Sequence, residues 1–239
     1  MNIKNIMDRV LFTLSVPKCV GCKSRLDYGQ KAFCPKCSAI FSDFRTRNCS
    51  HCNQLLHRCS CSNSFLEGHY IRRVIKCFRY LNRDESVGNR LIYSLKGDNR
   101  QDVLDVCADM LCDAIISSVD NPHECVFTNV PRRRSAIVEY GIDHSALLAK
   151  AVAERLNATY ISILKSRAKQ AQKSLERTER IKNADFVIKR EVDLTGKRVV
   201  IIDDIITSGA SVSVSASLLR TLGAKNITAA CLAIAYRDS

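Results

Sequence analysis

The stretch 199–211 constrains the fold more strongly than any other part of this chain. It opens with four apolar residues, Val199 to Ile202, which predict a buried parallel strand. Two adjacent aspartates follow at the end of that strand, and a short loop rich in Thr and Ser leads into an apolar-periodic helix, Val212 to Leu222. A strand, loop and helix in this order aim backbone N–H groups and the positive end of the helix at an anion. The sequence therefore predicts an α/β fold that holds a phosphate in this loop.

The residue types in the loop and at the strand end suit a sugar phosphate. The loop offers hydroxyls and a glycine that lets the backbone approach closely, so it can cradle a monoester phosphate. The two acids repel phosphate, but they accept hydrogen bonds from a diol such as that of ribose. An ordinary strand–turn–helix with a Thr or Ser N-cap would explain the hydroxyls but not the acids. We therefore assign a ribose 5-phosphate site to Asp203, Asp204, Ile205, Ile206, Thr207, Ser208, Gly209, Ala210 and Ser211.

This stretch resembles the signature with which phosphoribosyltransferases bind phosphoribosyl pyrophosphate (PRPP). The shared pattern is a hydrophobic strand, two acids, two apolar residues, Thr-Ser-Gly, one further residue and Ser. The resemblance implies a type I phosphoribosyltransferase fold, in which helices flank a parallel sheet and a small hood covers the site. A Walker loop and a dinucleotide-binding fingerprint are excluded, because neither Gly-x-x-x-x-Gly-Lys nor Gly-x-Gly-x-x-Gly occurs in the chain.

The cysteines predict an N-terminal zinc-ribbon module. Eight of the thirteen cysteines lie between residues 19 and 61, in closely spaced pairs that are typical of metal sites. Two Cys-x-x-Cys motifs separated by eleven residues predict one structural zinc site, with the ligands Cys19, Cys22, Cys34 and Cys37. A second zinc site is predicted at Cys49, Cys52, Cys59 and Cys61. Its last pair is the less regular Cys-x-Cys, so His51 and His57 are alternative ligands. Four thiolates leave no open position, and we expect no catalytic zinc.

Length and charge suggest one ordinary domain, a small module and polyanionic partners. The chain has 239 residues and a net charge of +13, which favours nucleic acid or phosphorylated small molecules. We expect a module at 1–66, with a short amphipathic helix at its start, and a phosphoribosyltransferase-like domain at 67–239. The sequence shows no secretory cleavage site and no membrane span, so we expect a cytoplasmic protein that does not associate with a membrane.

The remaining elements are predicted from hydrophobic periodicity and turn signals. Helices are expected at 87–95, 103–116 and 145–156, the last with Asp143 as a candidate N-cap. A strand or hairpin is expected at 69–81, and strands at 124–130, 160–164 and 227–236. A polar, basic segment follows the strand predicted at 160–164. Residues 165–198 carry eleven Lys and Arg against five Asp and Glu, which indicates a lid, a binding loop or a solvated segment.

Across nearly its whole length the chain resembles the ComF (ComFC) family, the double-zinc-ribbon proteins of bacterial natural transformation. The resemblance rests on the cysteine ribbon, Val130-Pro131 with the arginines that follow, and the PRPP signature. Gly141 to His144 departs from the family's usual Gly-Phe-Asn-Gln. The family implies a pyrophosphate site, for which guanidinium groups are suited, at Arg132, Arg133, Arg134 and Lys96. It also implies a lid that covers PRPP or contacts nucleic acid, with Arg167, Lys169, Gln172, Lys173, Arg177 and Arg180.

Two functions from different classes follow from this resemblance. The first is a phosphoribosyltransferase that uses PRPP with Mg²⁺ and an acceptor that the sequence does not identify. The second is a single-stranded DNA-binding protein that keeps the PRPP pocket as a sensor or as a scaffold. For either one, the family implies a role in taking up transforming DNA, with a helicase-type protein as a partner.

Overall fold

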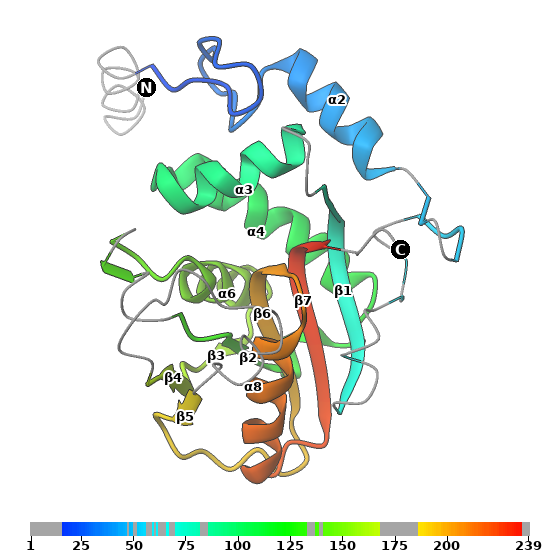
Figure 1. Ribbon diagram of the computed structural model, residues 1–239, viewed down its shortest axis with the longest axis vertical. Helices are drawn as coiled ribbons and strands as arrows, with labels where there is room; N and C mark the ends of the chain where they lie inside the picture. Colours follow the sequence, from blue (N-terminus) through cyan, green and yellow to red (C-terminus); the bar gives the residue numbers. More distant parts are fainter. Residues whose placement is uncertain are drawn as a thin grey trace.

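The computed structural model describes residues 16–46, 48–49, 52–55, 59, 61, 66, 70–81, 86–132, 137–138, 141–167 and 186–235 (Figure 1). The amphipathic helix predicted at the N-terminus lies outside these ranges. Within them, no helix combines the length and the apolar character that a membrane span requires.

The centre of the fold is a five-stranded sheet in which every neighbouring pair of strands is parallel. The strand order is β1-β7-β6-β2-β3, with bounds Ile71–Tyr80 (β1), Asn226–Ala235 (β7), Arg198–Ile206 (β6), Val126–Asn129 (β2) and Thr159–Tyr160 (β3). Because β6 is the middle strand, its carboxyl end lies at the centre of the edge where parallel α/β sheets bind ligands.

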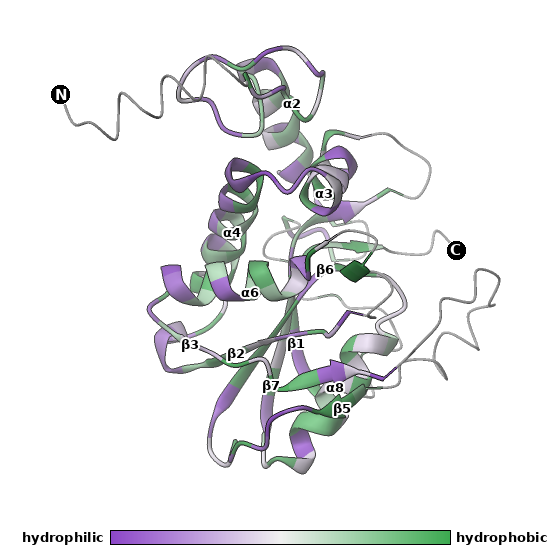
Figure 2. Cartoon of the chain, turned by 90° about the vertical axis from the view of Figure 1, so that its left-hand side faces the viewer, coloured by the Kyte–Doolittle hydropathy of each residue, from purple (hydrophilic) through white to green (hydrophobic). Residues whose placement is uncertain are grey.

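Helices cover both faces of this sheet, as the phosphoribosyltransferase resemblance implied. The helices are α2 (Pro35–Arg45), α3 (Val87–Gly97), α4 (Gln101–Ile116), α6 (His144–Arg155) and α8 (Ala210–Thr221), with a 3₁₀ turn η1 at Pro122–Glu124. Figure 2 shows α4 and α6 on one side of the sheet and α8 on the other. A separate antiparallel pair is formed by β4 (Leu164–Ser166) and β5 (Phe186–Ile188).

The sheet separates two hydrophobic cores, and the alternation of β6 assigns its residues to one or the other. Val200 and Ile202 lie in the core that α4 and α6 cover. Val199 and Ile201 lie in the core that α8 covers. All four side chains are at most 1% exposed, which confirms the buried parallel strand expected from this apolar run.

The N-terminal cysteine segment is continuous with the larger core. Leu26, Phe33 and Phe41 are buried in the same cluster as Phe78 of β1. The rings of Phe41 and Phe78 meet edge to face, with centroids 5.4 Å apart. The segment that carries the first two cysteine pairs is therefore packed against β1 and α3 rather than tethered loosely to the sheet.

Several predicted elements have different bounds in the structure. The segment predicted as one strand at 160–164 is two strands in different sheets, because the chain leaves the main sheet after Tyr160 and pairs with β5 from Leu164. Residues 71–80 form one strand, not a hairpin. The strand predicted from Glu124 begins at Val126, after the 3₁₀ turn. The other predicted helices and the closing strand are confirmed within a few residues.

Candidate functional site: a charged cluster at the carboxyl end of the central strand

The two aspartates of the signature lie within β6 rather than after it. The strand was expected to end before Asp203, but it continues to Ile206 and pairs with β7 along this whole length. This extension fixes the two carboxylates on a rigid element. Asp204 is only 4% exposed, whereas Asp203 is partly exposed. A carboxylate as buried as that of Asp204 requires charged or hydrogen-bonding partners.

Asp204 obtains its partners from two distant segments. Lys96, near the end of α3, places its Nζ 3.1 Å from Oδ2 of Asp204. The guanidinium group of Arg132, in the segment after β2, bonds to the same oxygen. Burial alone would raise the pKa of Asp204, but the two cations hold it below its usual value. The structure thus brings together three of the predicted site residues and leaves Asp204 ionised.

Asp203 lies in a different electrostatic environment. Its carboxylate accepts hydrogen bonds from the hydroxyl of Ser145 at 3.2 Å and from the backbone N–H of Asp204 at 2.9 Å. Burial and the neighbouring charge of Asp204 raise the pKa of Asp203 to about 8. At neutral pH the two adjacent acids therefore differ in charge, with Asp203 protonated and Asp204 ionised. Ser145 was not among the predicted site residues, because no local pattern links it to β6.

The raised pKa of Asp203 gives a pH dependence with a definite sign. Between about pH 4 and pH 8 the carboxyl is ionised in the unfolded chain but protonated in the folded one, so stability falls as pH rises through this range. We expect Asp203→Asn to remove this penalty. The difference in unfolding free energy between variant and wild type should grow by roughly 3.5 kcal/mol from pH 5 to pH 8 in urea titrations, at about 1.4 kcal/mol per pH unit below the folded-state pKa. A constant difference across that range would contradict the raised pKa.

The loop after β6 has the geometry expected of an anion cradle. Gly209 has a positive φ of 82° and occupies the N-cap position of α8, so a side chain here would strain the backbone. Helix α8 starts at Ala210, two residues earlier than predicted. The unpaired N–H groups of its first turn therefore lie next to the loop, where an anion would bind. Ile205 and Ile206 complete the strand and belong to the apolar cores, where Ile206 is 1% exposed. The polar loop of the signature therefore begins immediately after a buried, firmly held strand end.

The other predicted contacts are only partly described. Arg167 follows β4 and is exposed, and within the described residues it forms no hydrogen bond or ion pair with the acids of β6. The remaining predicted residues of the pyrophosphate and lid sets lie outside the described residues: Arg133, Arg134, Lys169, Gln172, Lys173, Arg177 and Arg180.

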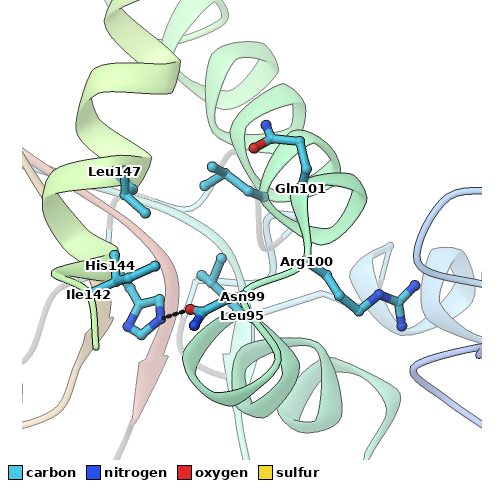
Figure 3. Close-up of a pocket in the computed structure, with 8 residues that line it drawn as sticks. Leu95, Asn99, Arg100, Gln101, Ile142, His144 and Leu147 are labelled. Carbon is cyan, nitrogen blue, oxygen red and sulfur yellow. Dashed lines mark hydrogen bonds between the residues drawn. The ribbon is translucent and has the colours of Figure 1, made fainter. Parts of the chain in front are cut away.

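A small cavity adjoins the charged cluster on the side of α4 and α6 (Figure 3). It has a volume of about 120 Å³, and its lining includes Leu95, the neighbour of Lys96. Nε2 of His144 lies 3.3 Å from Oδ1 of Asn99 at this cavity, and Figure 3 shows the two side chains pointing toward each other. Asp143 is the N-cap of α6, since its carboxylate accepts from the N–H of Ala146 at 3.0 Å. The motif 141–144 therefore starts α6 and lines one wall of the cavity.

The eight N-terminal cysteines form two clusters that fit zinc. Within each cluster the four Sγ atoms lie within 4.8 Å of one another. Examples are 3.7 Å between Cys22 and Cys34 and 3.5 Å between Cys52 and Cys59. Four sulfurs at about 2.3 Å from a tetrahedral zinc are separated by roughly 3.8 Å, so both clusters can hold the ion. The second cluster gathers all four predicted cysteines, including the Cys-x-Cys pair. The alternative ligands His51 and His57 lie outside the described residues.

Comparison with known protein families identifies the domain that carries the site. The model of the phosphoribosyl transferase domain matches residues 141–238, which include the signature and α6. Together with the parallel sheet and its flanking helices, this match confirms the type I phosphoribosyltransferase fold. Lys96 and Arg132 lie before the matched residues, so the partners of Asp204 come from outside them.

Relatives share only parts of their length with this chain. A ribose-phosphate pyrophosphokinase of Saccharolobus solfataricus is 39% identical over 84 residues, which are 35% of this chain and 25% of that protein. DNA utilization protein YhgH of Salmonella typhi is 27% identical over 147 residues, which are 59% of this chain and 65% of YhgH. The chain thus spans a quarter of the first relative and about two thirds of the second.

Solved phosphoribosyltransferases are similar at low sequence identity. Purine phosphoribosyltransferase from Pyrococcus horikoshii is 21% identical, with a TM-score of 0.35 over 55% of this chain and 71% of that one. Adenine phosphoribosyltransferase from Thermoanaerobacter pseudethanolicus is 17% identical, with a TM-score of 0.40 over 62% of this chain and 86% of that one.

Proposed function

We propose that this chain binds PRPP with Mg²⁺ and transfers the phosphoribosyl group to an acceptor, releasing pyrophosphate. The observation that carries the proposal is that two cations and a buried acid meet at the carboxyl end of β6. A buried acid of β6 holds two cations beside a phosphate-type loop. The loop suits a 5′-phosphate, the acids suit a ribose diol, and the cations suit a pyrophosphate. These are the three parts of PRPP.

In this proposal the residues position the substrate and stabilise the leaving group. A nucleophile of the acceptor attacks C1 of the ribose, the bond from C1 to the pyrophosphate oxygen breaks, and pyrophosphate leaves with that electron pair. Lys96 and Arg132 neutralise the departing charge, while the loop from Thr207 to Ser211 and the two acids hold the sugar still. The cations must exchange Asp204 for pyrophosphate oxygens as the substrate binds.

Mg²⁺ fits this site as a companion of the substrate. Asp204 is the ionised acid of β6 at neutral pH, but its Oδ2 is already bonded to two cations. The ion would therefore be held mainly by pyrophosphate and ribose oxygens and by water, as Mg²⁺ commonly is in such sites. When bound, it supplies further positive charge to the leaving group.

Calorimetric titration with PRPP and Mg²⁺ tests the proposal directly. We expect binding that requires the pyrophosphate, so ribose 5-phosphate should bind at least tenfold more weakly. The double variant Asp203→Asn with Asp204→Asn should lose PRPP binding, because amides offer the diol fewer acceptor oxygens and carry no charge. A double variant that binds PRPP as tightly as the wild type would contradict the ribose assignment, and equal affinity for both ligands would contradict the pyrophosphate site.

The second candidate function is single-stranded DNA binding in the uptake of transforming DNA, in the cytoplasm and beside a helicase-type partner. Three observations favour it: the net charge of +13, the basic segment 165–198 and the likeness to a protein named for DNA utilization. Charge reversal at Arg167 and Lys169 should weaken binding of an oligothymidine and reduce its salt dependence, while PRPP binding stays unchanged. An unchanged salt slope would speak against this use of the segment.

A further inference from the structure

Lys76 is a buried lysine in the middle of β1, and no part of the proposed reaction uses it. Its side chain is 1% exposed, although lysine is almost never fully buried without partners. Its register partner is Cys231 of β7, whose own partner in β6 is Asp203. Lys76 therefore lies in the sheet two strands away from the signature, at a position where an apolar residue would be expected.

The ammonium group of Lys76 is directed at the second cysteine cluster. Nζ donates a hydrogen bond of 2.9 Å to the carbonyl of Cys59 and a second hydrogen bond to the carbonyl of Cys61. These two residues are the Cys-x-Cys pair, and both of their Sγ atoms belong to the cluster. One side chain of the sheet thus fixes the backbone on both sides of the single intervening residue. This explains how a pair with one residue fewer than usual can point both thiols at one centre.

Charge points to the same role for Lys76. Four thiolates around one zinc ion carry two net negative charges, and a nearby ammonium in a low-dielectric interior stabilises them. Groups that bond to the backbone or ligands of a metal site hold those ligands in the binding geometry, and losing one typically costs about 10–100-fold in metal affinity. At the first cluster, guanidinium groups and not a lysine bond to the neighbouring backbone. Arg100, for example, donates to the carbonyl of Lys18 at 2.6 Å.

We propose that Lys76 is the positioning residue of the second zinc site. It anchors the backbone of Cys59 and Cys61 on β1 and supplies a positive charge to the four-thiolate centre, so that metal retention and the order of β1 depend on each other. The inference rests on zinc occupancy of both clusters but not on PRPP binding or turnover. The zinc content of the wild type is measured first, because it tests zinc occupancy separately from the role of Lys76. Fewer than two zinc ions per chain overturns occupancy of both clusters, and an empty second cluster overturns the role of Lys76 as well.

The test is chelator-induced zinc release followed by thiol alkylation, resolved cysteine by cysteine by mass spectrometry. In Lys76→Met, a substitution of similar length without the charge, we expect labelling about tenfold faster at Cys49, Cys52, Cys59 and Cys61. Labelling of the first cluster should stay within about twofold of the wild type. Arg73→Met is the matched control, because Arg73 also lies in β1 and also donates to a carbonyl, that of Ser118, but does not contact either cluster.

Equal labelling rates in Lys76→Met and the wild type would overturn the role of Lys76 even if both zinc ions are present. Equally accelerated labelling of both clusters would also overturn it. Should Lys76→Met not fold, hydrogen exchange of the wild type decides the question. Removing the second zinc should speed exchange of the β1 amides around Lys76 at least tenfold and leave α6 unchanged. Unchanged exchange in β1 would overturn the proposed coupling.

Discussion

Cys19→Ser is expected to remove one zinc ion and most of the stability of the protein. Cys19 is completely buried, and its Sγ accepts the N–H of Cys34 at 3.3 Å, so the residue joins the two Cys-x-x-Cys pairs. Structural zinc contributes about 10–16 kcal/mol in small metal-dependent domains. That is as large as the whole stability of about 5–15 kcal/mol of an ordinary domain. A serine hydroxyl cannot replace the thiolate, because it stays protonated and binds zinc weakly.

The loss should extend beyond the ribbon itself. Phe33 and Phe41 share one core with Phe78 and Leu91, so unfolding of residues 16–46 exposes part of the core under α3. We expect a lower melting temperature, a zinc content reduced by one ion per chain, and binding of a hydrophobic dye. Thermal denaturation and metal analysis measure the first two.

The control is Cys125→Ala, which changes a buried cysteine outside both clusters. It should cost only the roughly 1–2 kcal/mol of an ordinary core truncation and leave the zinc content unchanged. If Cys19→Ser resembled Cys125→Ala in both zinc content and stability, the first cluster would not be a structural metal site.

The sequence was most informative where the function depends on neighbours in the chain. The signature is contiguous, so its strand, loop and helix could be predicted from one window, and the structure confirms them. The cysteine clusters were predictable for the same reason, because four ligands within a short segment fix a spacing. Even so, β6 extends to Ile206, since pairing with β7 continues past the acids. That pairing is a tertiary contact, and the local pattern does not contain it.

The pairing of distant charges could not be predicted from the sequence. Lys96 and Arg132 were assigned to pyrophosphate, and nothing local showed that both bond to Asp204. Ser145 and Lys76 were missed as well, because their partners lie 58 residues away in the first case and 15 and 17 residues away in the second. The break between β3 and β4 was also hidden, because an apolar run does not reveal which sheet each half will join.

Asp204→Asn is expected to separate the two halves of the proposed site, because it weakens ribose binding and strengthens pyrophosphate binding. In the wild type, pyrophosphate must compete with Asp204 for Lys96 and Arg132. The amide removes that competitor while keeping the shape of the side chain. We expect inorganic pyrophosphate to bind about tenfold more tightly, a gain of about 1.4 kcal/mol. Ribose 5-phosphate should bind more weakly, since the diol loses a charged acceptor.

The same substitution should destabilise the protein. Asp204 is 4% exposed and neutralises two neighbouring cations, so its loss leaves like charges close together in a partly buried site. Removing one partner of a fully buried ion pair costs about 3–5 kcal/mol. Because Lys96 and Arg132 are partly exposed, we expect roughly half of that. Inorganic pyrophosphate should restore much of the lost melting temperature in the variant but little in the wild type.

Arg132→Gln provides the opposite case, and together the two variants decide the assignment. It leaves Asp204 bonded to Lys96 but removes a guanidinium group from the pyrophosphate site, so pyrophosphate affinity should fall about tenfold or more. Affinity for ribose 5-phosphate should change little. Opposite changes in pyrophosphate affinity in Asp204→Asn and Arg132→Gln would mean that one set of cations serves both the acid and the leaving group. If both substitutions weakened pyrophosphate binding, Asp204 would have to hold Lys96 and Arg132 in place for the ligand, and the exchange of partners proposed here would be wrong.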